Sequence, residues 1–174
     1  ATSFLICAAN EPLARTHHLF DSFEGLSTPA ERDGDHWAAG ALAVSEDVVR
    51  KMLGRFDLVE YHAGWIPTRF DDVADREFAF VHIDVDLYEP TRDSVAFFYP
   101  RMTDGGILVC DDYGQATCPG ATRAVDEVLE GRPESMLPMP DGGGFLIKGR
   151  AVGDRSWDAA LANLPDIPVR EPGD

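Results

Sequence analysis

The chain has 174 residues, of which 44% are hydrophobic, and its 31 acidic and 15 basic residues give a formal net charge of -16. This length and apolar content suit one buried core, so we expect a single domain over residues 1–164 and a C-terminal tail at 165–174. The acidic excess argues against nucleic acid or an anionic membrane as a partner. The apolar run "FLICAA" is too short to span a bilayer.

Cysteine and histidine usage gives two further expectations. Cys7, Cys110 and Cys118 are odd in number and lack paired CxxC spacing, which favours a reduced, cytoplasmic setting without a zinc site. The histidines do not recur at the spacing of metal ligands in the sequence; they are His17, His18, His36, His62 and His82.

Predicted strands and helices alternate along the chain. The β-prone runs, in order, are "THHLF", "DLVEYHAG", "FAFVHIDVD", "GGILVCDDYG" and "GGGFLIKG". Helical patterns lie between them: Ser45 is placed to cap "SEDVVRKMLG", and Pro90 and Pro119 suit the first turns of two later helices. The apolar face of the first of these helices is Val48, Val49, Met52 and Leu53. Alternation of this kind predicts an α/β domain with a largely parallel sheet.

Acidic residues follow three of the predicted strands. Asp21 follows the first strand, Asp84 and Asp86 follow "FVHI", and Asp111 and Asp112 follow "GILVC". Ligands of open α/β sheets bind at this edge, and clustered carboxylates repel one another unless a cation such as Mg²⁺ neutralises them. A single Asp after a strand is commonly a turn former instead, and "DSFEG" keeps that alternative open for Asp21.

These motifs resemble the macrocin O-methyltransferase (TylF-like) family of class I S-adenosylmethionine-dependent methyltransferases. The resemblance rests on "DSFEGL", "VSEDVVRKMLGRFDLVEYHAGWIPTRF", "HIDVDLYEPT", "YPRMTDGGILVCDDYG" and "PGATRAVDEVL", which occur in the family's order. It implies a Rossmann-like fold with a mostly parallel, doubly wound sheet. It also implies methyl transfer from adenosylmethionine to a sugar hydroxyl of a natural product, as in macrolide antibiotic biosynthesis.

Residue roles follow from the same resemblance. The cofactor would be bound by Asp21, Ser22, Gly64 and Trp65, with Asp21 on the ribose hydroxyls and the turn at Gly64 beside the adenine. Mg²⁺ would be bound by Asp84, Asp111 and Asp112, with Asp84 also near the reacting centre.

The catalytic base is a separate question. Related catechol-type enzymes have a lysine three residues after the first metal-binding Asp, whereas this chain has Leu87 there. The base is therefore Asp84 or Asp86, or a metal-bound hydroxide.

The resemblance also implies that "TSFLICAA" is the helix after the Gly-rich turn. The family's first strand would then be missing from between the strands that end at Asp21 and Asp84. Alternatively, "SFLICAA" is itself a strand in that position. An N-terminally incomplete domain would expose strand edges, and we expect a homo-oligomer.

Two other functions remain open at this point. One is a DxD glycosyltransferase that binds a nucleotide sugar through a metal, which "DDYG" and "DSFEGL" argue against. The other is a non-catalytic methyltransferase-fold fragment.

Overall fold

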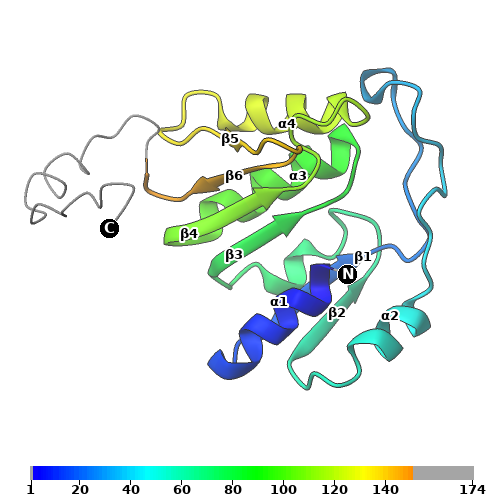
Figure 1. Cartoon of the computed structure of the whole chain (residues 1–174), viewed down its shortest axis with the longest axis vertical. Coiled ribbons are helices and arrows are strands. Elements are labelled where there is room, and N and C mark those ends of the chain that lie inside the picture. Colours follow the sequence, from blue (N-terminus) through cyan, green and yellow to red (C-terminus); the bar gives the residue numbers. More distant parts are fainter. Residues whose placement is uncertain (1, 151–174) are drawn as a thin grey trace, which may run out of the picture.

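The strands form two separate sheets in the computed structural model, which describes residues 2–150. β1 (His17–Asp21) and β2 (Val59–Ala63) pair in parallel (Figure 1). The second sheet has the order β3-β4-β6-β5, and its strands are β3 (Phe78–Ile83), β4 (Met102–Cys110), β5 (Leu137–Pro138) and β6 (Gly144–Ile147). β3 is parallel to β4, whereas β6 is antiparallel to both of its neighbours. The predicted tail at 165–174 lies outside the described residues.

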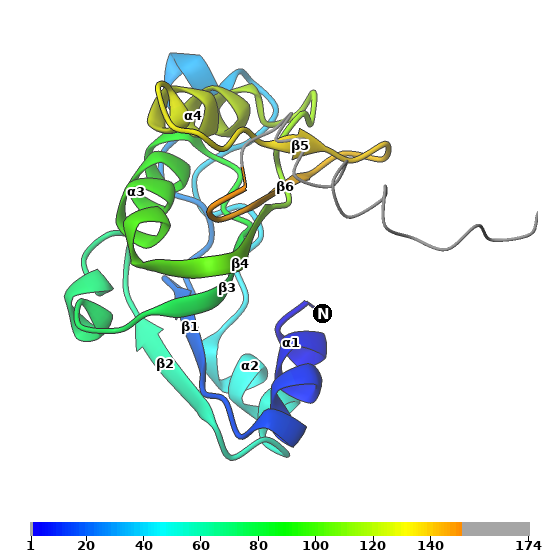
Figure 2. The ribbon, with the colours of Figure 1, turned by 90° about the vertical axis from the view of Figure 1, so that its left-hand side faces the viewer.

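Helices cover opposite faces of the strands. The α-helices are α1 (Thr2–Asn10), α2 (Glu46–Leu53), α3 (Tyr88–Phe98) and α4 (Pro119–Leu129). Single 3₁₀ turns are η1 (Glu11–Leu13), η2 (Glu31–Asp33), η3 (Phe70–Val73) and η4 (Tyr99–Arg101). Leu19 of β1 packs toward α1 and α2, while its neighbour Phe20 packs against the core under α3. Figure 2 shows the two helix pairs on different sides, so the doubly wound arrangement is confirmed.

Several local expectations are confirmed and others are wrong. The five predicted strands form, and Pro119 occupies the first turn of α4. "SFLICAA" is helical, so its interpretation as a strand is wrong. Ser45 precedes α2 but its side chain makes no capping bond, and Val48 and Met52 are 50% and 52% exposed rather than buried.

The two sheets differ in the size of their cores. The larger core packs α3 and α4 on β3 and β4, and it includes the fully buried Val95, Leu108 and Val125. Within the described part of the chain, the smaller core contains four buried residues, Cys7, Leu19, Leu53 and Phe56. All three cysteines are buried and unbridged. Among residues 2–150, no helix combines the length and the apolar character needed to cross a membrane.

A groove separates β1 from β3. Over the described part of the chain, β1 pairs with β2 and β3 pairs with β4, and no ladder joins β1 to β3. The space between them has a volume of about 780 Å³ and is lined by both strands and by α1. On its β3 side the groove is lined by Phe80, whose side chain is exposed. The position that the sequence assigns to a missing strand is therefore open.

Candidate active site

Four carboxylates gather where β3 and β4 end, and we call Asp84, Asp86, Asp111 and Asp112 the acidic rim. The two strand ends are joined by the amide of Asp111, which donates to the carbonyl of Ile83 at 2.9 Å. The carboxylate of Asp112 reaches across as well, because its Oδ2 accepts the amides of Val85 at 3.1 Å and Asp86 at 2.8 Å. These bonds fix the backbone between β3 and α3.

Burial and neighbouring carboxylates raise the pKa values of Asp84, Asp86 and Asp112. Burial, followed by repulsion from Asp112 and Asp84, raises the pKa of Asp86 to about 6. The pKa of the buried Asp112 is raised first by burial. Asp84 is exposed to solvent, yet its pKa is raised too. The causes are partial desolvation and then the negative charges of Asp112 and Asp111. A cation at this edge would relieve the repulsion that these shifts reflect.

The metal set implied by the sequence is only partly assembled. Asp84, Asp111 and Asp112 lie at the same strand ends, but over residues 2–150 the acidic group with ligand atoms within 4.8 Å of one another is Asp86, Asp112 and Cys118. The reason is local, since Asp112 turns toward the Val85 and Asp86 amides and Asp111 is 60% exposed. The Mg²⁺ assignment stays a prediction.

Asp86 occupies an unusual backbone conformation. Its φ is +61°, in the left-handed region that Asp and Asn tolerate better than most residues. Asp86 lies between the end of β3 and the start of α3, and its side chain is buried. Its Oδ1 lies 3.8 Å from Cys118 Sγ.

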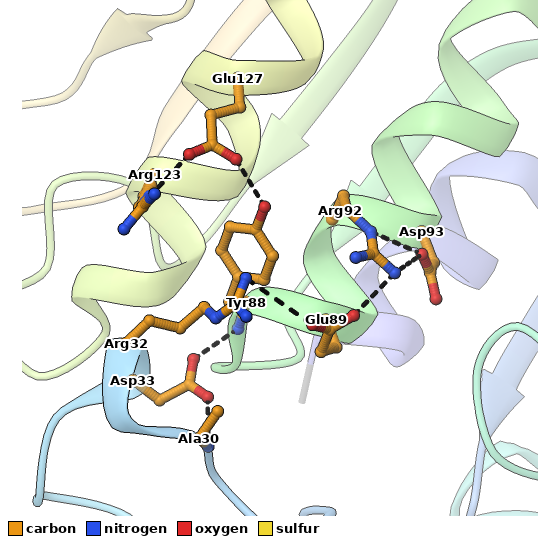
Figure 3. A network of polar contacts seen from close by, with 9 residues as sticks. All are labelled: Ala30, Arg32, Asp33, Tyr88, Glu89, Arg92, Asp93, Arg123 and Glu127. Carbon is orange, nitrogen blue, oxygen red and sulfur yellow. Dashed lines mark hydrogen bonds and ion pairs between the residues drawn. The ribbon is translucent and has the colours of Figure 1, made fainter.

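A buried carboxylate from a distant loop anchors the start of α3 (Figure 3). Asp33, in η2, accepts the amide of Tyr88 through Oδ1 at 2.7 Å and the amide of Ala30 through Oδ2 at 2.8 Å. The Tyr88 hydroxyl donates to Glu127 of α4 at 2.5 Å, and the Arg32 guanidinium lies 4.3 Å from the Tyr88 ring centroid. The loop, α3 and α4 are thus tied together directly behind the acidic rim.

This anchoring requires a glycine in the first turn of α4. A Cβ on Gly120 would lie 2.1 Å from Asp33 Oδ1 and 3.0 Å from the Tyr88 Cβ. Sequence reasoning missed Asp33, which looks like an ordinary loop acid in "ERDGDHW". Gly120 was the one sequence signal of this close contact. It was not informative, because Pro119 beside it already explains where the helix starts.

On the predicted cofactor side, Asp21 and Gly64 are adjacent. The Gly64 amide donates to the Asp21 carbonyl at 2.9 Å, where β1 and β2 end. The Asp21 side chain is exposed, and its Oδ1 accepts the amide of Phe23 at 2.8 Å. Asp21 therefore forms the expected turn through Oδ1, one of its two carboxylate oxygens.

Ser22 follows Asp21 and Trp65 follows Gly64, and the two side chains differ in their contacts. The Ser22 hydroxyl donates to the Gly25 carbonyl at 3.0 Å and accepts the Glu24 amide at 3.1 Å, so its side chain belongs to the turn. The Trp65 ring is partly exposed beside Gly64. Roles in cofactor binding for all four residues stay predictions.

Parallel strands with helices on both faces place the domain in the Rossmann-like class of α/β folds. Comparison with known proteins gives a narrower result. The family model for macrocin O-methyltransferase (TylF) matches residues 4–132, most of the chain. The chain belongs to this family.

Individual relatives agree with the family. The chain is 34% identical over 133 residues to demethyldecarbamoylnovobiocin O-methyltransferase of Streptomyces niveus, covering 70% of this chain and 50% of the relative. It is 31% identical over 127 residues to 8-demethyl-8-(2,3-dimethoxy-alpha-L-rhamnosyl)-tetracenomycin-C 4'-O-methyltransferase of Streptomyces olivaceus, covering 67% and 49%. The chain therefore spans about half the length of these curated relatives.

A solved structure supports the same fold. The O-methyltransferase NovP superposes with a TM-score of 0.67 at 26% identity, covering 84% of this chain and 66% of that one. A calicheamicin methyltransferase gives a TM-score of 0.69 at 22% identity, with 84% and 67% covered.

Proposed function

We propose that this chain is an S-adenosylmethionine-dependent, Mg²⁺-dependent O-methyltransferase that acts on a sugar hydroxyl of a natural product. The observation that carries the proposal is the acidic rim at the carboxyl ends of β3 and β4, in a chain of this family. Relatives named as O-methyltransferases of novobiocin-type and rhamnosyl-tetracenomycin compounds support the substrate class. They also favour methyl transfer over the glycosyltransferase alternative.

The residues present suit both proposed ligands. The rim offers hard carboxylate oxygens, which Mg²⁺ prefers, and the mutual repulsion of these groups favours a bound cation. Asp21 presents an exposed carboxylate at the end of β1, which suits the ribose hydroxyls of the cofactor. The partly exposed Trp65 ring next to Gly64 suits the adenine.

Bound adenosylmethionine would supply an activated methyl group and Mg²⁺ would supply a Lewis acid. The chain's own residues then hold the sugar hydroxyl and remove its proton. Asp86, whose pKa is about 6, is largely a carboxylate at neutral pH and suits the role of base. Asp84 is the alternative, since its carboxylate is exposed at the mouth of the groove.

Calorimetry on the 174-residue chain tests the cofactor site. Asp21→Ala is expected to weaken adenosylmethionine binding by about 10-fold to 150-fold, since a hydrogen bond to a charged group contributes roughly 1.5–3 kcal/mol. Asp57→Ala, an exposed acid before the opposite end of β2, is the matched control. Equal affinity in the Asp21 and Asp57 variants would refute the assignment.

A second titration tests the rim. Asp112→Asn is expected to abolish Mg²⁺ binding, whereas the exposed Asp75→Asn should leave it unchanged. Binding of a nucleotide sugar instead of adenosylmethionine would revive the glycosyltransferase function. Binding of neither ligand would favour a non-catalytic member of the fold.

We also propose that two copies associate through the groove. Its walls carry unpaired strand edges and apolar side chains, including the exposed Phe80 and Met52. Analytical ultracentrifugation should show a dimer that Phe80→Lys dissociates and that Leu13→Lys, outside the groove, does not. A monomeric wild-type chain would contradict this part of the proposal.

A further inference from the structure

A second group of potential metal ligands lies on the small sheet, away from the acidic rim. In the parallel register His18 of β1 pairs with Glu60 of β2, and Phe20 pairs with His62. Residues that are paired or two apart along a strand share a face. The three side chains of His18, Glu60 and His62 therefore meet, although their sequence spacing does not suggest a site.

Their ligand atoms are spaced as a tetrahedral metal requires. His18 Nδ1 lies 3.1 Å from His62 Nε2 and 3.4 Å from Glu60 Oε2, and one ligand atom from each residue lies within 4.8 Å of the others. With zinc–ligand bonds of about 2.0–2.1 Å, two ligands of a tetrahedral ion lie about 3.3 Å apart. The two observed separations, 3.1 and 3.4 Å, fall on either side of that value.

His62 is held in the orientation of a metal ligand. Its Nδ1 lies 2.9 Å from Asp72 Oδ2, and the Arg69 guanidinium holds the same oxygen through Nη2 at 2.6 Å. The imidazole is buried and stacks on Phe20 with a centroid distance of 4.3 Å. A histidine that donates a hydrogen bond from one ring nitrogen to a carboxylate presents the other nitrogen, here Nε2, as an unprotonated metal ligand.

Hydrogen bonding alone does not satisfy this cluster. His18 Nδ1 carries at most one proton, yet it faces two acceptors, His62 Nε2 and the Glu60 carboxylate. One divalent cation would contact all three atoms and remove the conflict. Glu60 is 57% exposed, which leaves an open side for water as a fourth ligand.

We propose that His18, Glu60 and His62 bind a zinc-type divalent cation, with Asp72 positioning His62. Two nitrogens and one oxygen form a ligand set that suits Zn²⁺ and does not suit Mg²⁺, which prefers oxygen ligands. Because the ligands come from both strands, the ion would join β1 to β2 across the less buried half of the molecule.

The test uses the 174-residue chain, freed of metal and then held in excess Mg²⁺ so that the acidic rim is occupied by its own preferred ion. Zn²⁺ titration by calorimetry should give one tight equivalent. Imidazole NMR signals of His18 and His62 should shift on Zn²⁺ addition, while that of His36 should not. Absence of these shifts would mean a hydrogen-bonded imidazole pair only, and would overturn the proposal.

Variants locate the ion. Glu60→Gln and Asp72→Asn are each expected to weaken Zn²⁺ binding at least about 10-fold. The exposed Glu130→Gln is the matched control, and circular dichroism checks that each variant is folded. Asp112→Asn must keep tight Zn²⁺ binding. Loss in Asp112→Asn together with retention in Glu60→Gln would assign the ion to the acidic rim and overturn the proposal.

Discussion

The half built on β1–β2 and the half built on β3–β4 differ in how much apolar surface they bury. Among residues 2–150, the larger half buries fourteen residues in one apolar core, whereas the smaller half buries four and carries an ionisable cluster on its sheet. Stability from burial scales with apolar area removed from water, so most of the folding free energy resides in the larger half. The smaller half has less apolar burial to stabilise it.

The largest expected effect comes from truncating each core at a matched position. Leu108→Ala in β4 should lower the free energy of unfolding by about 3–5 kcal/mol, since the side chain is fully buried. Leu53→Ala in α2, also fully buried, should mainly loosen the β1–β2 half. Urea denaturation and amide exchange separate the two. Equal loss of protection in both sheets from Leu53→Ala would break the comparison.

Removal of the carboxylate that anchors α3 should have the next largest effect. Asp33→Ala leaves the amides of Tyr88 and Ala30 without their acceptor and should destabilise the larger half by about 2–3 kcal/mol. Asp35→Ala changes an exposed acid of the same loop and should shift the urea midpoint little. Matching midpoints for the two variants would show that the anchor is dispensable.

The acidic rim should act in the opposite direction. The pKa of Asp86 is raised from 3.8 to about 6, so the native state binds its proton more tightly than the unfolded chain does. This contribution to stability is complete below about pH 3.8 and is lost as the pH rises through about 6. Asp86→Asn should therefore match wild type near pH 4 and be about 1–3 kcal/mol more stable at pH 7.5 without Mg²⁺.

Denaturation at a series of pH values measures this difference, with Asp75→Asn as the exposed control. Added Mg²⁺ should erase the advantage of the Asn variant, since a cation relieves the same repulsion. A pH-independent difference would show that the carboxylate is not the source.

The smallest effect concerns the start of α2 in the smaller half. Ser45 makes no side-chain capping bond, so Ser45→Ala should change stability by less than about 0.5 kcal/mol, below the roughly 1 kcal/mol typical of a cap. The thermal midpoint measures this change. Ser45→Gly serves as the comparison, and a full capping loss in the Ala variant would contradict the described geometry.

Much of the fold was predictable because local patterns decide it. The runs "FAFVHI" and "GGILVC" contain Phe, Val and Ile, which favour strands, and Pro119 starts α4 where the sequence places it. The split between sheets was also predictable from the resemblance, because "TSFLICAA" as the helix after the Gly-rich turn leaves no strand between those that end at Asp21 and Asp84. The exposure of Val48 and Met52 was not predictable. An apolar helix face indicates burial, but the sequence does not show which surface would cover it.

The site was predictable only in outline. Acids after strands indicate the edge at which they gather, but side-chain rotation decides which of them meet, and Asp112 turns toward Asp86 rather than toward Asp84 and Asp111. His18 and His62 are separated by 44 residues and meet only through the register of β1 and β2. Asp33 acts on Tyr88 across 55 residues, a distance that no local pattern spans.

The left-handed backbone conformation at Asp86 limits which side chains fit this position without strain. Glycine, asparagine and aspartate adopt this conformation most readily, so most other side chains would add backbone strain at this position whatever their effect on the chemistry. An aspartate retained at position 86 across a lineage would thus record backbone geometry as well as charge. Asp84 is free of that constraint, and its retention would report on the chemistry of the rim alone.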